Sequence, residues 1–295
     1  DEDPEFRMED EFVTGDEIEV LAKSFAEISH RTVMYLDEVK RVTAEKERIS
    51  TELEMARRIQ ESMIPSIFPA FPERKEFDVY AVMDPAKEVG GDFYDFFLID
   101  QDHLGIVMAD VSGKGVPAAL FMMASKIIVQ SYAQMDNSAA EILRKTNERI
   151  CSNNEMQMFV TVWVGILEIS TGKLIASNAG HEYPAIMRKN GGFELFKDPH
   201  GFVIGGMSGV MYKDYELNLE PGDKVFLYTD GVPEATDKDK KLFGTDRMIE
   251  ALNEDPSVEP EKILGNVRKA VDAFVKDEEQ FDDLTMLCLE YKGKK

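Results

Sequence analysis

Apolar residues recur every three and four positions between residues 16 and 64, a stretch that contains neither proline nor glycine. A heptad frame that starts at Ile18 runs through it without a break. Its a positions are Ile18, Phe25, Thr32, Val39, Lys46, Leu53 and Gln60, and its d positions are Leu21, Ile28, Tyr35, Val42, Ile49, Ala56 and Met63. The pattern predicts a coiled coil, most simply a parallel dimer, in which Thr32, Lys46 and Gln60 fix the register. A single amphipathic helix lying on its own globular domain stays open, although ~46 residues at ~1.5 Å each give ~70 Å, longer than a domain.

The pattern changes after the helix. Three prolines in residues 65–76 end it and mark a boundary. Short β-rich runs follow at residues 77–83, 104–110, 158–170, 173–180, 183–189, 193–196, 215–219, 224–231 and 284–291, and helical patterns at 116–134, 138–150, 244–253 and 260–278. Consecutive hairpins indicate antiparallel sheets covered by helices. We therefore expect a dimerisation and signalling helix in residues 1–64, a boundary in 65–76 and a globular domain, large enough to be an enzyme, in 77–295.

Composition narrows the function classes. The formal charge of −23 argues against a nucleic-acid role, which needs a basic face. Two cysteines, Cys151 and Cys288, make no disulfide framework, and a cytoplasmic location is expected. No run of 18 or more apolar residues is present, and the acidic start is no signal peptide. Because the first residue is not Met, a membrane segment further upstream stays open.

Aspartate stands at the edge of an apolar strand in four places. These are Asp92 in GGDFYD, Asp110 in IVMADVSGKG, Asp230 in VFLYTDG and the pair Asp282-Asp283 in QFDDLTML. One such aspartate is an ordinary turn residue. Four of them, brought together by strand ends, would repel one another unless divalent cations offset their charge. Hard oxygen donors favour two Mg²⁺ or Mn²⁺ ions over Zn²⁺, and such ions can activate water for attack on a phosphoryl group.

Two short motifs resemble signatures of nucleotide-binding proteins, but neither matches its signature residue by residue. GGDFYD shares only three letters with the GGDEF signature of diguanylate cyclases, because Phe93-Tyr94 replace Glu-Phe. SGKG lacks the earlier glycine of a Walker loop, where Met108 stands, and Gly115 follows the lysine in place of Ser or Thr. We expect Gly113 and Gly115 to let the backbone pass close to the metal site and enter the next helix.

The motifs ARRIQESMIP, GGDFYD, ADVSGKGVPAALFM, NAGHEYP, LYTDGVPEA and DDLTML occur in this order. Together they closely resemble the bacterial PPM-type serine/threonine phosphatases of the SpoIIE/RsbU group, from about residue 54 to the C-terminus. The resemblance implies an α+β fold, an α-β-β-α sandwich of two antiparallel sheets with helices outside. It also implies a site for two Mn²⁺ or Mg²⁺ ions between the sheet edges.

Carried over by motif, Asp92 and Asp110 would share the two metals and hold the metal-bridging water, and the Val111 carbonyl would add a contact. Asp230 would bind the second metal. In the last motif the family's acid matches Asp282, while Asp283 stays open.

For four further positions, the motifs give weaker support for a role in the site. Ser112 stands where animal relatives have a proposed general-acid histidine. Lys87 holds the spacing of their phosphate-binding arginine. His181 in NAGHEYP is expected to be structural or to pack near the site rather than to act as an acid or base. Gly113 lies in the same loop as Ser112.

The N-terminal stretch TGDEIEVLAKSFAEIS resembles the second helix of a HAMP linker. We therefore expect the output domain of a receptor, homodimeric through its coiled coil, with a transmembrane sensor as a candidate upstream partner. The resemblance implies hydrolysis of phosphoserine on a STAS-domain anti-anti-sigma protein in partner-switching signalling. The alternative is an inactive, phosphatase-like coiled-coil scaffold.

Overall fold

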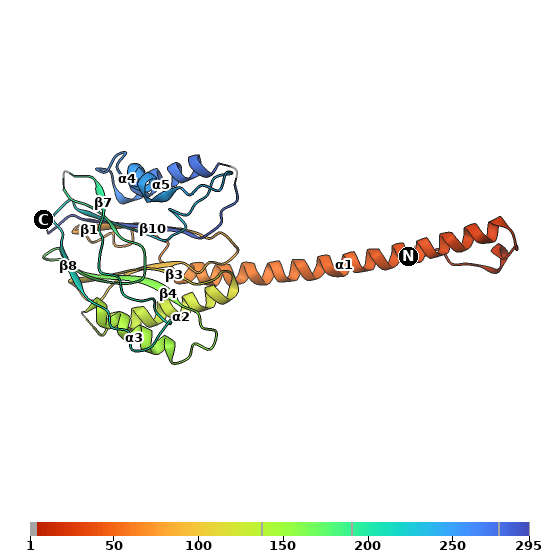
Figure 1. The fold of residues 1–295 in the computed structure, drawn as a ribbon, viewed down its shortest axis with the longest axis horizontal. Helices are drawn as coiled ribbons and strands as arrows, with labels where there is room; N and C mark the ends of the chain where they lie inside the picture. Colours follow the sequence, from red (N-terminus) through yellow and green to blue (C-terminus); the bar gives the residue numbers. More distant parts are fainter. Residues whose placement is uncertain (1–4, 137, 190, 277, 295) are drawn as a thin grey trace. The chain divides into compact units, whose positions relative to one another are not determined.

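The computed structural model describes residues 5–136, 138–189, 191–276 and 278–294. The chain divides into two compact units, Asp1–Ala56 and Arg57–Lys295. Helix α1 (Glu17–Met63) crosses this division, so its last turns belong to the second unit (Figure 1). The two units are described separately below.

The first unit contains the short 3₁₀ helix η1 (Asp10–Phe12) and most of α1. The segment before α1 folds back onto it: the Phe6 and Phe25 rings lie 5.0 Å apart, and the Phe6 amide donates to Ser29 Oγ at 2.8 Å. Beyond this contact the predicted seam is exposed to solvent, as Leu21 (70% exposed) and Ile28 (61%) illustrate. Within the described residues of this unit, the apolar stripe therefore has no cover along most of its length.

The second unit contains two five-stranded sheets, and every strand pairing between neighbours is antiparallel. The first has the order β1 (Phe77–Asp84), β10 (Leu284–Tyr291), β9 (Lys224–Tyr228), β6 (Ala185–Met187) and β7 (Phe193–Leu195). The second has the order β2 (Phe93–Leu98), β3 (His103–Val111), β4 (Val160–Glu168), β5 (Lys173–Ala179) and β8 (Tyr215–Asn218).

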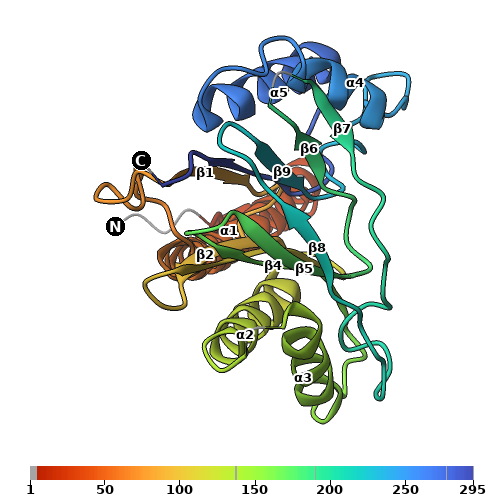
Figure 2. The ribbon, with the colours of Figure 1, turned by 90° about the vertical axis from the view of Figure 1, so that its left-hand side faces the viewer.

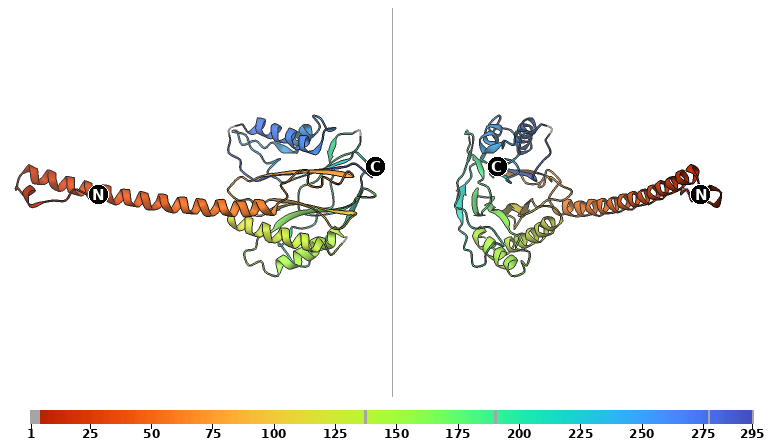
Figure 3. Two further views of the ribbon diagram at one scale, coloured as in Figure 1. Left: turned by 180° about the vertical axis from the view of Figure 1, so that it is seen from behind. Right: turned by 45° about the vertical axis from the view of Figure 1, so that its right-hand side comes forward.

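Helices cover the outer faces of both sheets (Figures 2 and 3). Helices α2 (Val116–Ala133) and α3 (Ala139–Cys151) pack on the β3-β4-β5 side, whereas α4 (Gly244–Leu252) and α5 (Pro260–Val275) pack on the β1-β10 side. One apolar cluster contains residues of both sheets together with α2 and α3, and a second fills the space under α4 and α5. The predicted α-β-β-α sandwich is confirmed.

Helix α2 is the one helix in the described part of the chain that is long and apolar enough to cross a membrane. In this fold it is a core helix, with Ala118, Met122 and Val129 buried against the domain. It also carries Lys126, whose Nζ donates to Asp95 Oδ2 at 2.7 Å in a nearly fully buried ion pair. The pair joins α2 to β2 and accounts for Asp95, the second aspartate of GGDFYD.

The last turns of α1 pack one face against the second unit. Gln60 is 2% exposed, its Nε2 donates to the Gly90 carbonyl at 2.7 Å, and its Oε1 accepts from the Gly90 amide at 3.1 Å. The heptad frame predicts Gln60 as a polar seam residue that fixes a dimer register. The structure instead gives both ends of its amide a partner within its own domain.

Candidate metal centre

Strand ends from both sheets carry the four aspartates. Asp92 immediately precedes β2, and Asp110 is the penultimate residue of its hairpin partner β3. Asp230 follows the end of β9, and Asp282 precedes β10, which pairs with β9 in the other sheet. The antiparallel pairing of β2 with β3 and of β9 with β10 therefore places each pair of acids at one end of its sheet.

Asp92 and Asp110 lie close enough for each carboxyl group to affect the pKa of the other. Burial, followed by the charges of Asp110 and Asp283, raises the pKa of Asp92 well above its usual range. Burial and then the charge of Asp230 raise the pKa of Asp110 to about 7. Such a buried carboxyl pair needs a shared proton or a cation to be stable.

Asp230 extends this acidic group from the other sheet. Burial, then the charges of Glu234, Asp282 and Glu182, raises its pKa to about 6. Asp282 is more open, with 27% of its side chain exposed, and its Oδ2 lies 2.8 Å from Lys114 Nζ. The four predicted acids therefore interact electrostatically across the two sheets.

Asp283 has a different role from Asp282. Its Oδ1 accepts from the Ala86 amide at 2.9 Å, and its Oδ2 accepts from the Gly91 amide at 2.7 Å and the Asp92 amide at 3.4 Å. A Cβ on Gly90 would lie 2.3 Å from the same Oδ2. Gly90 is therefore needed for the close approach of the Asp283 carboxylate, which anchors the loop that presents Asp92.

Sequence reasoning missed two further residues that hold Asp92. Thr229 Oγ1 donates to Asp92 Oδ2 at 2.7 Å across the two sheets. Gln60 holds the Gly90 backbone two residues before Asp92. Thr229 directly precedes Asp230 within the LYTDG motif. This position beside a proposed ligand is the only indication of its role that the sequence offers.

The loop after β3 supplies the remaining predicted positions. The Val111 carbonyl points toward Gly91, where an added Cβ would lie 3.0 Å from its oxygen. Ser112 is bound to a neighbouring loop, with its Oγ accepting from the Phe159 amide at 2.9 Å. Gly113 has a φ of 88°, a left-handed conformation that only glycine adopts readily. Lys87 is exposed.

His181 lies beside the site as a buried residue, 3% exposed. Its Nδ1 lies 2.9 Å from Thr161 Oγ1, and Thr161 pairs with Asp110 across β3 and β4. Burial lowers the pKa of His181 from 6.5 to about 3, so the ring is neutral at pH 7. The neutral, enclosed imidazole contacts β4, the neighbour of the strand that carries Asp110, in a position that suits packing beside the site.

The donor chemistry suits a hard divalent ion. Asp92, Asp110, Asp230, Asp282 and the Val111 carbonyl offer only oxygen atoms, and the raised carboxyl pKa values reflect charge that a cation would offset. Among the described residues, no three acidic, histidine or cysteine side chains already stand in a metal-binding arrangement. The set therefore fits Mg²⁺ or Mn²⁺ by chemistry, whereas its ligand geometry is not preformed.

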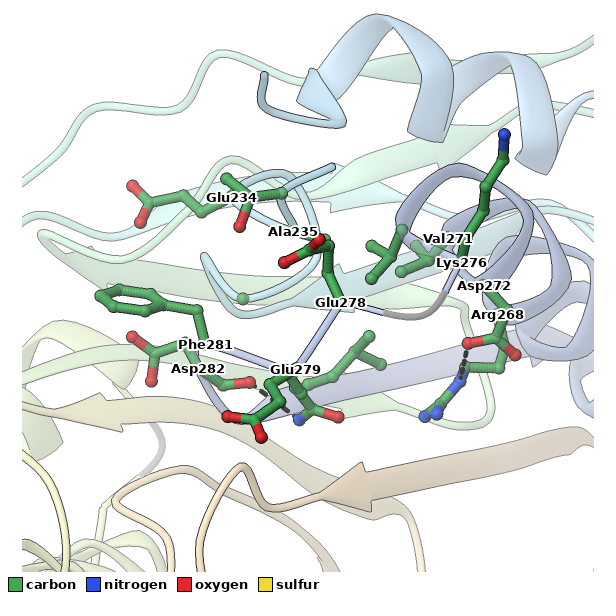
Figure 4. A pocket seen from close by; sticks show the side chains of 15 residues that line it. Glu234, Ala235, Arg268, Val271, Asp272, Lys276, Glu278, Glu279, Phe281 and Asp282 are labelled. Atoms are coloured by element: carbon green, nitrogen blue, oxygen red, sulfur yellow. Dashed lines mark hydrogen bonds and ion pairs between the residues drawn. The ribbon is translucent and has the colours of Figure 1, made fainter. Parts of the chain in front are cut away.

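A cavity of about 180 Å³ adjoins Asp282 on the α5 side. Figure 4 shows Glu234, Phe281 and Asp282 at one end and Arg268 and Lys276 at the other. Arg268 is paired with Asp272 at 2.8 Å and with Asp84. Arg268 is thus already neutralised at the end of the cavity opposite Asp282.

Comparison with known proteins identifies the fold and the family. The fold is that of PP2C-type phosphatase domains: the SiaA-PP2C domain of Pseudomonas aeruginosa superimposes with a TM-score of 0.72 at 21% identity, covering 84% of this chain and 99% of that domain. Residues 100–292, more than half of the chain, match the family model for stage II sporulation protein E. The chain belongs to the SpoIIE family.

Two curated relatives extend the similarity beyond the sandwich. Protein IcfG of Synechocystis sp. is 30% identical over 93% of this chain, and phosphoserine phosphatase RsbU of Bacillus subtilis is 27% identical over 84%. The chain spans 46% of the length of IcfG and 72% of that of RsbU.

The contacts of Asp282 and Asp283 predict opposite phenotypes. Asp283→Ala leaves buried backbone amides without an acceptor and should lower the free energy of unfolding by about 2–4 kcal/mol. Asp282→Ala removes a half-exposed ion pair and should cost less than about 1 kcal/mol, while it weakens Mn²⁺ binding. Urea unfolding followed by the fluorescence of the single, buried Trp163 and calorimetric Mn²⁺ titration measure the two effects. The reverse pattern would contradict these assignments.

The lowered pKa of His181 predicts that the free energy of unfolding depends on pH. Its folded pKa is about 3 and its ordinary value 6.5, so between these values the unfolded chain binds a proton that the folded chain does not. The contribution of His181 to the free energy of unfolding is therefore complete above pH 6.5 and is lost as the pH falls. From pH 7 to pH 5, wild type should lose about 2 kcal/mol more than His181→Gln. His30→Gln, at an exposed histidine, is the control and should behave as wild type; equal losses in wild type and His181→Gln would refute the prediction.

Proposed function

We propose that this chain is a metal-dependent protein-serine/threonine phosphatase. The observation that carries the proposal is the meeting of buried carboxylates from both sheets, in which Asp92 and Asp110 each affect the pKa of the other and the charge of Asp230 adds to the raised pKa of Asp110. A fold gains no stability from such a cluster without a cation, so its presence favours a metal-dependent activity over simple partner binding. The name of RsbU, a phosphoserine phosphatase, agrees with this reaction class.

Two Mn²⁺ or Mg²⁺ ions would be held by Asp92, Asp110, the Val111 carbonyl, Asp230 and Asp282. When bound, they would supply an activated water and stabilise negative charge on the phosphoryl group. The chain's own contribution is positioning. Asp283 and Gln60 fix the backbone that presents Asp92.

The proposed substrate is phosphoserine on a STAS-domain regulatory protein, and the proposed setting is partner-switching signalling in the cytoplasm. This step rests on the family resemblance of the motifs, and it makes the chain the output domain of a signalling receptor. A transmembrane sensor upstream is part of the same proposal.

We further propose that α1 forms a parallel dimer. The apolar a and d residues of the first unit are exposed, among them Leu21, Ile28 and Val42 (51%), and a second copy of the helix would bury them. The helix then continues to Gln60, which holds the loop before Asp92. A change in the register or twist of the coiled coil can therefore alter how residues 56–64 dock on the catalytic unit.

The phosphatase proposal predicts hydrolysis of p-nitrophenyl phosphate that requires Mn²⁺ or Mg²⁺ and is lost with EDTA. Asp110→Asn and Asp230→Asn should each lower kcat by at least about 100-fold, because each removes a charged metal ligand. His30→Gln, a substitution in the first unit, is the control.

Two measurements on the wild-type chain separate the alternatives. Calorimetric titration should detect Mn²⁺ binding to the folded protein, and the steady-state assay should detect turnover. A folded sample with neither would leave the inactive scaffold as the function.

The dimer proposal predicts the behaviour of two variants. Ile28→Glu places a charge in the seam and should convert a dimer into a monomer at micromolar concentration, as measured by light scattering. Ala44→Glu, at an f position outside the seam, is the matched control. Deleting residues 1–52 should likewise give a monomer with altered activity; a dimer with unchanged activity would contradict the model.

A further inference from the structure

Lys114 is a cationic residue that contacts Asp282, one of the four acids of the site. It lies in the loop between β3 and α2, four residues after Asp110, and its Nζ is 2.8 Å from Asp282 Oδ2. The same Nζ donates to the Phe281 carbonyl at 2.6 Å and lies 3.9 Å from the centre of the Phe281 ring. Lys114 thus joins the loop that follows Asp110 in one sheet to the loop that precedes β10 in the other.

These contacts do not satisfy the whole ammonium group. A lysine ammonium has three N–H donors, and the contacts given by the described residues use two of them, to Asp282 and to Phe281. About a third of the side chain, 32%, remains exposed to solvent. Positive φ angles at Gly113 (88°) and Gly115 (78°) shape the turn on both sides of Lys114. The group is therefore held in place and still has a donor available to a ligand.

An open hollow of about 930 Å³ lies against this ammonium. Its lining residues are Ala86, Lys87, Glu88, Lys114, Glu279, Gln280 and Phe281. Lys87 belongs to the loop that Asp283 anchors through the Ala86 amide, so both lysines are attached to loops that present metal-binding acids. Lys87 and Lys114 are the positively charged residues of this lining, and Glu88 and Glu279 are the negatively charged ones.

The negative net charge of the chain explains why a substrate-binding cation is needed at this entrance. A phosphorylated protein that approaches a chain of net charge −23 meets repulsion, which a local positive group at the entrance offsets. No arginine is among the described residues that line the hollow. Lys114 is the lysine with a fixed geometry there, and its influence extends to Asp230, whose pKa it lowers against the larger raising effect of burial.

We propose that Lys114 binds the phosphoryl oxygens of the substrate, with the hollow beside it holding the segment that carries the phosphoserine. The proposal rests on the phosphatase function above and adds a substrate-binding residue to it. Lys87 supplies a second, more distant charge. The exposed ring of Phe281 (69% exposed) offers an apolar surface to the residues next to the phosphoserine.

The first test measures binding without turnover. Inorganic phosphate is titrated into the Mg²⁺-loaded full chain and followed by calorimetry. Lys114→Gln should weaken phosphate binding about tenfold or more, because one charge-assisted hydrogen bond is lost. Lys114→Arg should stay within about threefold of wild type. Lys262→Gln, which removes an equal charge at a surface pair with Glu259, is the matched control.

The second test separates substrate binding from support of Asp282. Mn²⁺ titration of Lys114→Gln should give wild-type affinity within about threefold, and the KM for a phosphoserine peptide should rise more than kcat falls. The proposal is overturned if Lys114→Gln binds phosphate as wild type does, if only Lys87→Gln weakens phosphate binding, or if Lys114→Gln loses Mn²⁺ affinity tenfold. A wild-type chain that binds phosphate through Lys114 without hydrolysing esters would refute the phosphatase function and leave this site standing.

Discussion

The repulsion between buried carboxylates at the ends of the two sheets is the constraint on which the catalytic unit depends. Two charges ~4 Å apart repel by ~4 kcal/mol even at an effective dielectric constant near 20, and the charge of Asp110 adds to the raised pKa of the buried Asp92. The backbone has to hold them there. The amides of Gly91 and Asp92 donate to Asp283, and Thr229 Oγ1 donates to Asp92 itself. One aspartate is thus used to position another.

The catalytic unit also contains a buried ion pair, between Asp95 and Lys126. Asp95 lies on β2, three residues after Asp92, and Lys126 lies on the helix entered from the Asp110 loop. Replacing both members of a buried pair by apolar residues is often neutral, whereas removing one costs about 3–5 kcal/mol. The pair therefore adds specificity more than stability, because it fixes one relative position of β2 and α2.

The sequence predicts the parts of this site that follow from strand patterning. Asp92, Asp110 and Asp230 each border an apolar run, so their gathering at sheet edges follows from antiparallel pairing. The choice between Asp282 and Asp283 does not, since adjacent residues before a strand point in different directions and pattern alone cannot assign them. Gln60 and Lys114 were equally hidden: a heptad frame describes Gln60 only by its spacing, and a lysine in a glycine turn resembles any solvated lysine until its partners are known.

Gln60 also limits where the proposed coiled coil can end. A straight α-helix drifts about 20° per heptad from a seam of period seven, which amounts to about 120° over the six heptads from Ile18 to Gln60. Supercoiling removes that drift and would turn Gln60 toward a second helix, whereas in its own unit Gln60 is buried against Gly90. One side chain cannot do both, so the seam has to end before Gln60. The proposed coiled coil and the residue that holds the loop before Asp92 therefore belong to one continuous helix, so in this proposal a change in the twist of the coiled coil would alter the contact of Gln60 with Gly90.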